Sequence, residues 1–177
     1  MLKLIISGGQ IGADQAGWRA AKACGIPTGG WMPKGFLTED GPRPEFAGLY
    51  GATEHDSPLY PPRTAANIRD SDFTLIFQFD GMLSRGTVLA KDLCQKHHKP
   101  WDIVFHKTGW LPGRFAKQFL ESFRINDPGV SWRLNIAGNR ESKAPGIGAW
   151  VEVYCRELFK LLRAREVDAG GDVAGSK

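Results

Sequence analysis

Residues 2–14 read LKLIISGGQIGAD, and this stretch decides the fold class. The apolar run Leu2–Ser7 passes directly into a turn that contains three glycines. Behind the turn, the segment 13–24 carries alanine and cysteine at three- and four-residue spacing, which predicts a helix with a narrow stripe of small side chains. The stretch therefore predicts a strand, a glycine turn and a helix that lies close against a sheet.

The same order of strand, loop and helix recurs along the rest of the chain. The expected elements are strands at 73–79, 101–105 and 132–137 and helices at 63–69, 86–98, 115–123 and 147–165. Parallel strands need helical crossovers, and these crossovers cover both faces of a sheet. We therefore expect an α/β fold: a single Rossmann-like domain over residues 1–166, with a mostly parallel sheet and helices on both faces, followed by a disordered tail at 167–177.

The composition is that of an ordinary globular protein. Of the 177 residues, 42% are hydrophobic and 24% are charged, which excludes a collagen-like chain, a coiled coil and a wholly disordered protein. The formal net charge is +4, without the cluster of basic and aromatic residues that is typical of nucleic-acid binding. We expect a small anionic ligand as the partner, and no nucleic acid.

The apolar runs and the cysteines indicate the compartment. No run approaches the roughly 20 apolar residues that cross a bilayer, and the first residues carry no secretory hydrophobic region. Cys24, Cys94 and Cys155 are far apart and form no Cys-x-x-Cys pair, which favours a reducing compartment. We expect a cytoplasmic protein with no membrane partner. Because His55 and His106 lack partners at metal-ligand spacing, no protein-ligated metal is predicted.

The glycine turn is the first candidate ligand site. Its candidate binding residues are Ser7, Gly8, Gly9, Gln10 and Gly12, with Asp14 at the start of the helix. Glycines let backbone N–H groups approach an anion at a helix N-terminus, so the turn predicts phosphate binding. Ser7 replaces the first glycine of the dinucleotide-binding pattern, which argues against NAD. The alternative is a tight turn in which Asp14 supplies a negative charge to the helix start.

Two later loops carry further candidates. Gly86 and Thr87 open a helix and predict a second phosphate site, although helix capping explains the same residues. The segment 138–146 contains Arg140, Glu141, Ser142 and Lys143. Arg140 can hold an oxyanion with two hydrogen bonds, whereas the alternative is a solvated loop with Glu141 paired to a cation. Since ligands bind at the carboxyl ends of parallel strands, we expect these loops to share one cleft with the glycine turn.

Between residues 25 and 62 the pattern is interrupted by glycine, proline and polar residues. Short strands are expected near 26–28 and 49–53, and the rest of this long region is typical of a binding loop. Within it, Lys34 lies close to Trp31 on a segment with glycine hinges, which indicates a lid over a ligand. The alternative is an exposed loop with Trp31 tucked into the core.

The residues around these loops resemble one family over nearly the whole chain. The matching blocks, in order, are Ser7-Gly8-Gly9-Gln10 with Gly12-Ala13-Asp14, Gly29-Gly30-Trp31 with Pro33-Lys34-Gly35, Arg63-Thr64 with Asn67, Gly86-Thr87, and Arg140-Glu141-Ser142-Lys143. These blocks are similar to the family named putative molybdenum carrier proteins, which belongs with the lysine-decarboxylase-like Rossmann proteins.

The resemblance implies a homo-oligomeric Rossmann-like protein that holds an anionic, phosphate-bearing ligand at its glycine loops. That ligand is either a pterin such as the molybdenum cofactor or a nucleotide. The resemblance also adds Arg63 to the candidate ligand-binding residues. Ile11, Gln15 and Ser84-Arg85 stand where the family more often has other residues, so the ligand stays open between these two classes.

An enzyme, a phosphoribohydrolase acting on nucleoside monophosphates, is the alternative that the wider superfamily implies. In those relatives a carboxylate follows closely after the Gly-Thr pair. Here Gly86-Thr87 is followed by Val-Leu-Ala-Lys, and the nearest acid, Asp92, lies more than one helical turn beyond Thr87. The resemblance therefore favours a binding or carrier protein, and no catalytic residue is assigned.

Overall fold

The computed structural model describes residues 1–79, 81, 83–109, 111–122 and 131–171. Its strands are β1 (Leu2–Ser7), β2 (Thr28–Met32), β3 (Leu37–Thr38), β4 (Gly41–Pro42), β5 (Ala52–Glu54), β6 (Phe73–Gln78), β7 (Trp101–Phe105) and β8 (Trp132–Gly138). Its helices are α1 (Ala13–Ala23), α2 (Phe46–Tyr50), α3 (Tyr60–Asp70), α4 (Arg85–Lys96), α5 (Pro112–Ser122) and α6 (Ile147–Gly171), with a 3₁₀ turn, η1, at Lys34–Phe36.

Six strands form one sheet in the order β5-β2-β1-β8-β6-β7, and every pairing in it is parallel. β3 and β4 form a separate antiparallel hairpin. The last strand of the chain, β8, lies between β1 and β6. The final strand–loop–helix unit of the sequence is therefore a direct neighbour of the first, and their loops emerge at the same edge.

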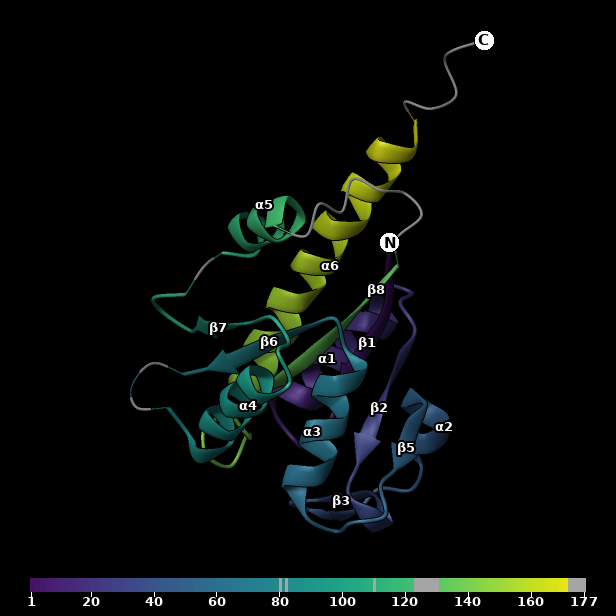
Figure 1. The fold of residues 1–177 in the computed structure, drawn as a ribbon, viewed down its shortest axis with the longest axis vertical. Coiled ribbons are helices and arrows are strands. Elements are labelled where there is room, and N and C mark those ends of the chain that lie inside the picture. The colour runs from purple at the N-terminus through teal and green to yellow at the C-terminus, as the bar shows by residue number, and fades with distance from the viewer. Residues whose placement is uncertain (80, 82, 110, 123–130, 172–177) are drawn as a thin grey trace.

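Helices cover both faces of the sheet. α3 and α4 pack together in front of the strands in Figure 1, and α1 and α6 pack together behind them. On the α1 side, the fully buried Trp18 stacks on Tyr50 of α2 at 4.7 Å between ring centroids and donates a hydrogen bond from Nε1 to the Gly29 carbonyl. The predicted fold class, a single Rossmann-like α/β domain with helices on both faces, is confirmed.

The second strand lies later in the chain than expected. The prediction of a strand at 26–28 was wrong, because β2 occupies Thr28–Met32. Gly30 has a φ of 131°, and a Cβ there would lie 2.1 Å from the Ser7 carbonyl oxygen. Gly30, one of the glycines that suggested a loop, is therefore needed because β2 passes very close to β1 at this position.

Two helices differ from the sequence prediction. α3 begins at Tyr60 rather than near Arg63, because the two prolines that suggested a loop occupy its first turn. The N–H groups of a first helical turn have no partner within the helix, so the missing N–H of proline costs no hydrogen bond there. α2, at Phe46–Tyr50, was not predicted; it ends at Gly51, whose left-handed φ of 66° terminates it.

The end of the chain extends the last helix. α6 continues to Gly171, past the domain boundary expected at residue 166. Residues 172–177 and Phe123 lie outside the described residues, so the disordered tail stays a prediction.

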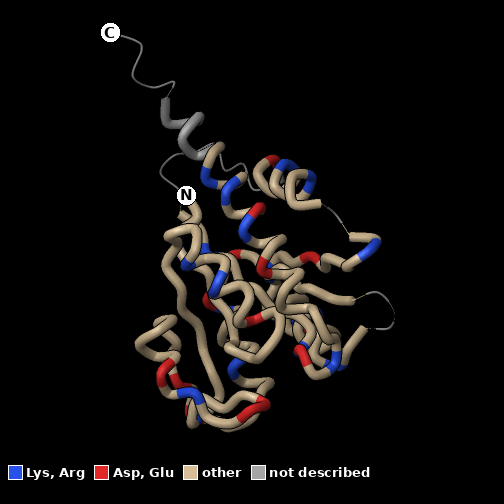
Figure 2. Tube along the Cα trace, turned by 180° about the vertical axis from the view of Figure 1, so that it is seen from behind, with Lys and Arg blue, Asp and Glu red and all other residues tan. Residues whose placement is uncertain are grey.

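Charged residues of both signs are interspersed along the chain in the view from behind (Figure 2). One ion-pair group joins the two helices on this side: Arg19 donates to Glu152 at 2.6 Å, and Arg156 donates to the same carboxylate. None of the helices in the described part of the chain is both long enough and apolar enough to cross a membrane.

Gly17 tests the close packing of α1 on β8. A Cβ at Gly17 would lie 2.7 Å from the Ile136 side chain, whereas a Cβ at Gly48 of α2 would meet nothing within 4 Å. We expect Gly17→Ala to lower the free energy of unfolding by about 1–3 kcal/mol through overpacking. Gly48→Ala is the matched control and should cause no loss. Equal urea midpoints for the two variants would contradict this packing.

Candidate functional site

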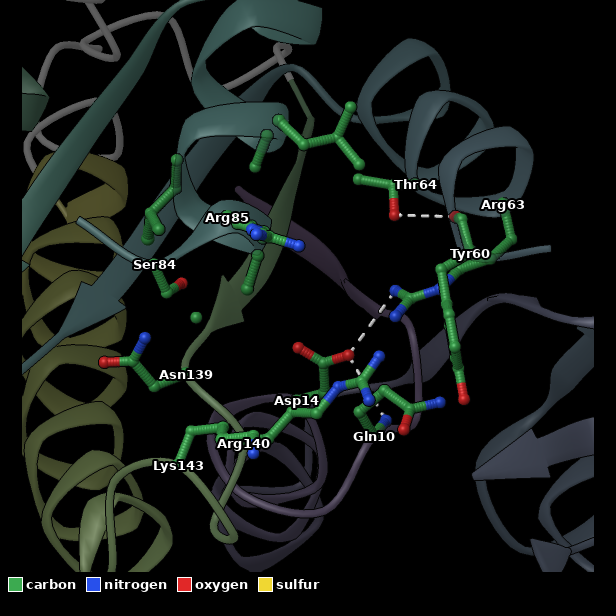
Figure 3. A pocket seen from close by; sticks show the side chains of 16 residues that line it. Gln10, Asp14, Tyr60, Arg63, Thr64, Ser84, Arg85, Asn139, Arg140 and Lys143 are labelled. Carbon is green, nitrogen blue, oxygen red and sulfur yellow. Dashed lines mark hydrogen bonds and ion pairs between the residues drawn. The ribbon is translucent and has the colours of Figure 1, made fainter. Parts of the chain in front are cut away.

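A cavity of about 540 Å³ opens at the carboxyl ends of β6 and β8. Its walls come from the first turn of α3, the first two turns of α4, the glycine turn after β1 and the loop 139–143 (Figure 3). Segments far apart in the sequence therefore meet at one place. The convergence expected from the Rossmann-like topology is present, with members of all three predicted loops in the lining.

Four cations line this cavity: Arg63, Arg85, Arg140 and Lys143. Within the described part of the chain, Arg85, Arg140 and Lys143 form no ion pair with a carboxylate. Asp14 is the one acidic residue in the described lining. The cavity consequently carries an excess of positive charge that suits an anionic ligand.

The Asp14 carboxylate and the Arg63 guanidinium form a buried pair at the floor of the site. Arg63 Nη1 lies 3.5 Å from Asp14 Oδ2, which also accepts a hydrogen bond from the Gln10 backbone N–H at 3.2 Å. A Cβ at Gly8 would lie 1.5 Å from Arg63 Nη1, so only glycine leaves room for the guanidinium. Burial raises the pKa of the Asp14 carboxyl, and Arg63 opposes that rise; burial also lowers the pKa of Arg63.

The ring of Tyr60 holds the Arg140 guanidinium in place. The Arg140 Cζ lies 4.3 Å from the centroid of the Tyr60 ring, and the Arg63 Cζ lies 5.7 Å from the same centroid. A guanidinium held against an aromatic face keeps its N–H donors available in its own plane. Tyr60 therefore orients Arg140 without consuming its hydrogen-bonding capacity.

Two polar atoms of the lining residues are buried without a partner among the described residues. They are Gln10 Oε1 and Arg63 Nε. The nitrogen of the Gln10 amide does have a partner, since Nε2 donates to the Leu37 carbonyl of the β3–β4 hairpin at 3.0 Å. An unmet acceptor and an unmet donor are costly in a protein interior, and both belong to residues of this cavity.

A hydrogen-bond network shapes the wall formed by α4. Ser84 caps the helix by accepting from the Thr87 N–H at 3.1 Å, and Thr87 Oγ1 donates to Gln78 Oε1 at 2.7 Å. Asn139 Nδ2 donates to the same Gln78 oxygen at 3.0 Å. The network joins the ends of β6 and β8 to the first turn of α4, so the helix N-terminus faces the cavity at a fixed position.

The remaining wall is apolar. Ile76 of β6 and Ala137 of β8 are register partners, and Leu89 and Ala90 of α4 line the same cavity. The site thus has a charged part and an apolar part, which suits a ligand with an anionic group attached to a flat ring.

Comparison with known proteins agrees with this fold. Residues 5–159 match the model of the circularly permutated YpsA SLOG family. The chain belongs to this family. It is also similar to a solved structure from Syntrophus aciditrophicus, a protein named putative molybdenum carrier protein. The two share 34% identity and a TM-score of 0.75, over 91% of this chain and 94% of the other. None of the curated proteins compared matches the chain.

Six of the residues predicted for ligand binding line the cavity in this member of the YpsA SLOG family. They are Gln10, Asp14, Arg63, Gly86, Arg140 and Lys143. The sequence analysis missed Tyr60. Arg85 and Asn139 were not chosen as ligand-binding residues, although both lie in loops that were expected at the cleft. Asn139 and Gln78 carry a recognisable signal, because both are amides placed where neighbouring strands end.

Several glycine-turn residues are placed in packing contacts instead. Ser7 Oγ donates to the Ile136 carbonyl at 2.7 Å, and Gly8 lies beneath Arg63. Gly9 packs against Met32, and Gly12, with a φ of 116°, packs against the backbone of residues 139–141. Thr87 is buried, and it donates its N–H to the cap residue Ser84 and its hydroxyl to Gln78.

The other predicted site residues do not line the cavity. Glu141 accepts hydrogen bonds from the N–H groups of Gly146 and Gly148 and so caps the start of α6. Ser142 donates to Glu39 at 2.6 Å, which joins the loop to the β3–β4 hairpin. Lys34 is exposed on η1. Among the described residues, no cluster of three or more His, Cys, Asp or Glu could hold a metal ion.

The capping role of Glu141 leads to a stability prediction. Glu141→Ala should lower the free energy of unfolding by about 1–2 kcal/mol, the usual cost of losing a helix cap. Glu45→Ala is the control, because Glu45 is exposed and its one described ion pair, with Arg43 at 3.7 Å, is a weak surface contact. Chemical denaturation of both variants measures the difference. A Glu141→Ala protein as stable as the Glu45→Ala protein would show that the cap contributes nothing.

Proposed function

We propose that this protein binds a small anionic ligand that carries a phosphate and a planar ring, and that it acts as a carrier for that ligand. The observation that carries the proposal is the set of three cations, Arg85, Arg140 and Lys143, that face one cavity without a carboxylate partner in the described residues. Cations without internal partners are typical of sites whose counter-charge arrives with the ligand.

The position of the phosphate follows from α4. Gly86 lies in the first turn of a twelve-residue helix, and the nearest atom to a Cβ built there is Ser84 Oγ at 3.9 Å. The N-terminal N–H groups of such a helix attract an anion, and Arg85 and Lys143 border the same cavity. We place the phosphate between this helix start and the loop of Arg140 and Lys143.

The ring of the ligand fits the apolar part of the cavity. Small-molecule sites are commonly about 300–1,000 Å³ and mostly apolar with a few placed polar groups, and this cavity, at about 540 Å³, falls within that range. The similar protein from Syntrophus aciditrophicus is named as a putative molybdenum carrier. That name supports a phosphate-bearing pterin, the molybdenum cofactor, as the cargo; a nucleotide is the other ligand with the same two parts.

We further propose that the carrier is cytoplasmic and homo-oligomeric. Cys24, Cys94 and Cys155 are free thiols, which suits a reducing compartment. The support for an oligomer is the family resemblance, and light scattering on the purified chain tests it.

One observation favours a hydrolase as the second candidate. Asp14 places a buried carboxyl with a raised pKa inside the cavity, although the sequence offers no carboxylate closely after Gly86-Thr87. A carboxyl of this kind can act as a general acid in bond cleavage. The two candidates share the binding site and differ in whether the ligand leaves intact.

The binding proposal predicts a contrast between two lysines. Lys143→Ala should weaken the binding of a pterin phosphate or a nucleoside monophosphate by about tenfold or more, because it removes a charge-assisted hydrogen bond. Lys160→Ala removes the same charge from an exposed position on α6 and is the control. Titration calorimetry measures both affinities, and equal affinities for the two variants would refute the placement of the phosphate.

The carrier proposal also predicts the absence of turnover. Purified protein incubated with a panel of nucleoside monophosphates should release no free base at enzymatic rates, because no carboxylate follows closely after Gly86-Thr87 and Asp14 Oδ2 already accepts from Arg63 and the Gln10 N–H. Chromatography of the released base is the measurement. Turnover of about 1 per second or more, lost in Asp14→Asn, would establish the hydrolase instead.

A further inference from the structure

The two oxygens of the Asp14 carboxylate have different surroundings. Oδ2 takes both of the hydrogen bonds described for this side chain, from the Gln10 N–H and from Arg63 Nη1. Oδ1 has no hydrogen-bond partner among the described residues. In Figure 3, Oδ1 points away from Arg63 and into the cavity.

A free carboxylate oxygen in a cationic cavity needs a donor from the ligand. An ionised carboxylate can only accept hydrogen bonds. Burial raises the pKa of Asp14, but Arg63, the Gln10 N–H and Arg140 oppose that rise and favour the ionised form. Phosphate oxygens are acceptors too, so Oδ1 repels the anionic part of the ligand. The part of the ligand that suits Oδ1 is therefore a donor on its ring.

We propose that Asp14 Oδ1 selects a ligand whose ring is a 2-amino-4-oxopyrimidine, the unit shared by pterin and guanine. This inference rests on the proposed function and narrows its ligand class. Such a ring presents a ring N–H and an adjacent amino group, two donors on one edge. The corresponding edge of adenine places an acceptor nitrogen beside its amino group, and that nitrogen would face the lone pairs of Oδ1.

The substitution Asp14→Asn should reverse the preference for a 2-amino ring, because the partners of Oδ2 fix which way the new amide points. In Asp14→Asn, the amide oxygen should stay with the Gln10 N–H and Arg63, because both are donors. The amide NH₂ then takes the position of Oδ1 and faces the cavity as a donor. A donor there favours a ring with oxygen at position 2, namely xanthine in place of guanine and lumazine in place of pterin.

The test compares matched ligands on the full-length protein by titration calorimetry. The nucleotide series is GMP, IMP, XMP and AMP, and the ring series is a pterin phosphate and the corresponding lumazine phosphate. For the native protein we expect GMP to bind about tenfold or more tightly than IMP, which lacks the 2-amino group, or AMP, since a site built for a donor rejects analogues without it. The pterin phosphate should likewise bind about tenfold or more tightly than the lumazine phosphate.

For Asp14→Asn we expect the order to invert, with XMP tighter than GMP and lumazine phosphate tighter than pterin phosphate. Asp40→Asn is the matched control, since Asp40 is an exposed carboxylate outside the cavity lining, and it should retain the native order. The affinities of GMP and the pterin phosphate are also compared. Tighter binding of GMP indicates a guanine nucleotide as the ligand, and tighter binding of the pterin phosphate indicates a pterin.

The outcomes separate the inference from the proposed function. If the native protein binds all of these phosphates equally, the ring selection by Asp14 is wrong and the anion-binding proposal stands. If no ligand of either series binds, the proposed function fails and the inference fails with it. Should Asp14→Asn not fold, the native series alone decides, because native affinities that ignore the 2-amino group overturn the inference.

Discussion

The Arg63 guanidinium lies over the bare backbone of Gly8, and its ion pair with Asp14 organises the whole site. This one contact joins α3, the turn after β1 and the first turn of α1 at the edge of the sheet. Burying an arginine is unfavourable unless a carboxylate offsets its charge, and Asp14 is the carboxylate that does so. The turn is consequently filled by protein atoms. Among the described residues of the cavity, the cations without a carboxylate partner are Arg85 on α4 and Arg140 and Lys143 on the loop after β8.

The topology explains why the cationic loop reaches this edge. The last strand, β8, enters the sheet between β1 and β6 rather than at its side. The loop after β8 therefore pairs with the loop after β1, through the bridge between Gly12 and Arg140 and the hydrogen bond from the Glu141 N–H to the Ile11 carbonyl. Residues far apart in the sequence therefore form one wall of the cavity.

The sequence predicted the fold well where a periodic pattern was unambiguous. The strand at 101–105 is confirmed at its exact bounds, and the parallel order follows from the alternation of strand and helix. The errors come from glycine and proline. Gly30 signals a loop in a sequence but lies within β2, and the prolines after Tyr60 signal a loop but begin α3.

The site was harder to predict than the fold because its contacts are long-range. The predicted convergence of loops required only the topology, whereas the role of each residue required packing. Nothing in the local sequence indicates that Arg63 lies over Gly8 or that Glu141 caps α6. Tyr60 was missed for a similar reason, since its contact with Arg140 joins residues far apart in the chain.

A crystal structure of the protein in complex with a pterin phosphate or a nucleoside monophosphate tests the account most directly. The account predicts phosphate oxygens within about 2.7–3.2 Å of the Arg140 guanidinium and of the N–H groups at the start of α4, with the ring against Leu89 and Ile76. A ligand bound at the separate depression beside Trp31 and Arg133, with the cavity around Arg140 left empty, would contradict it.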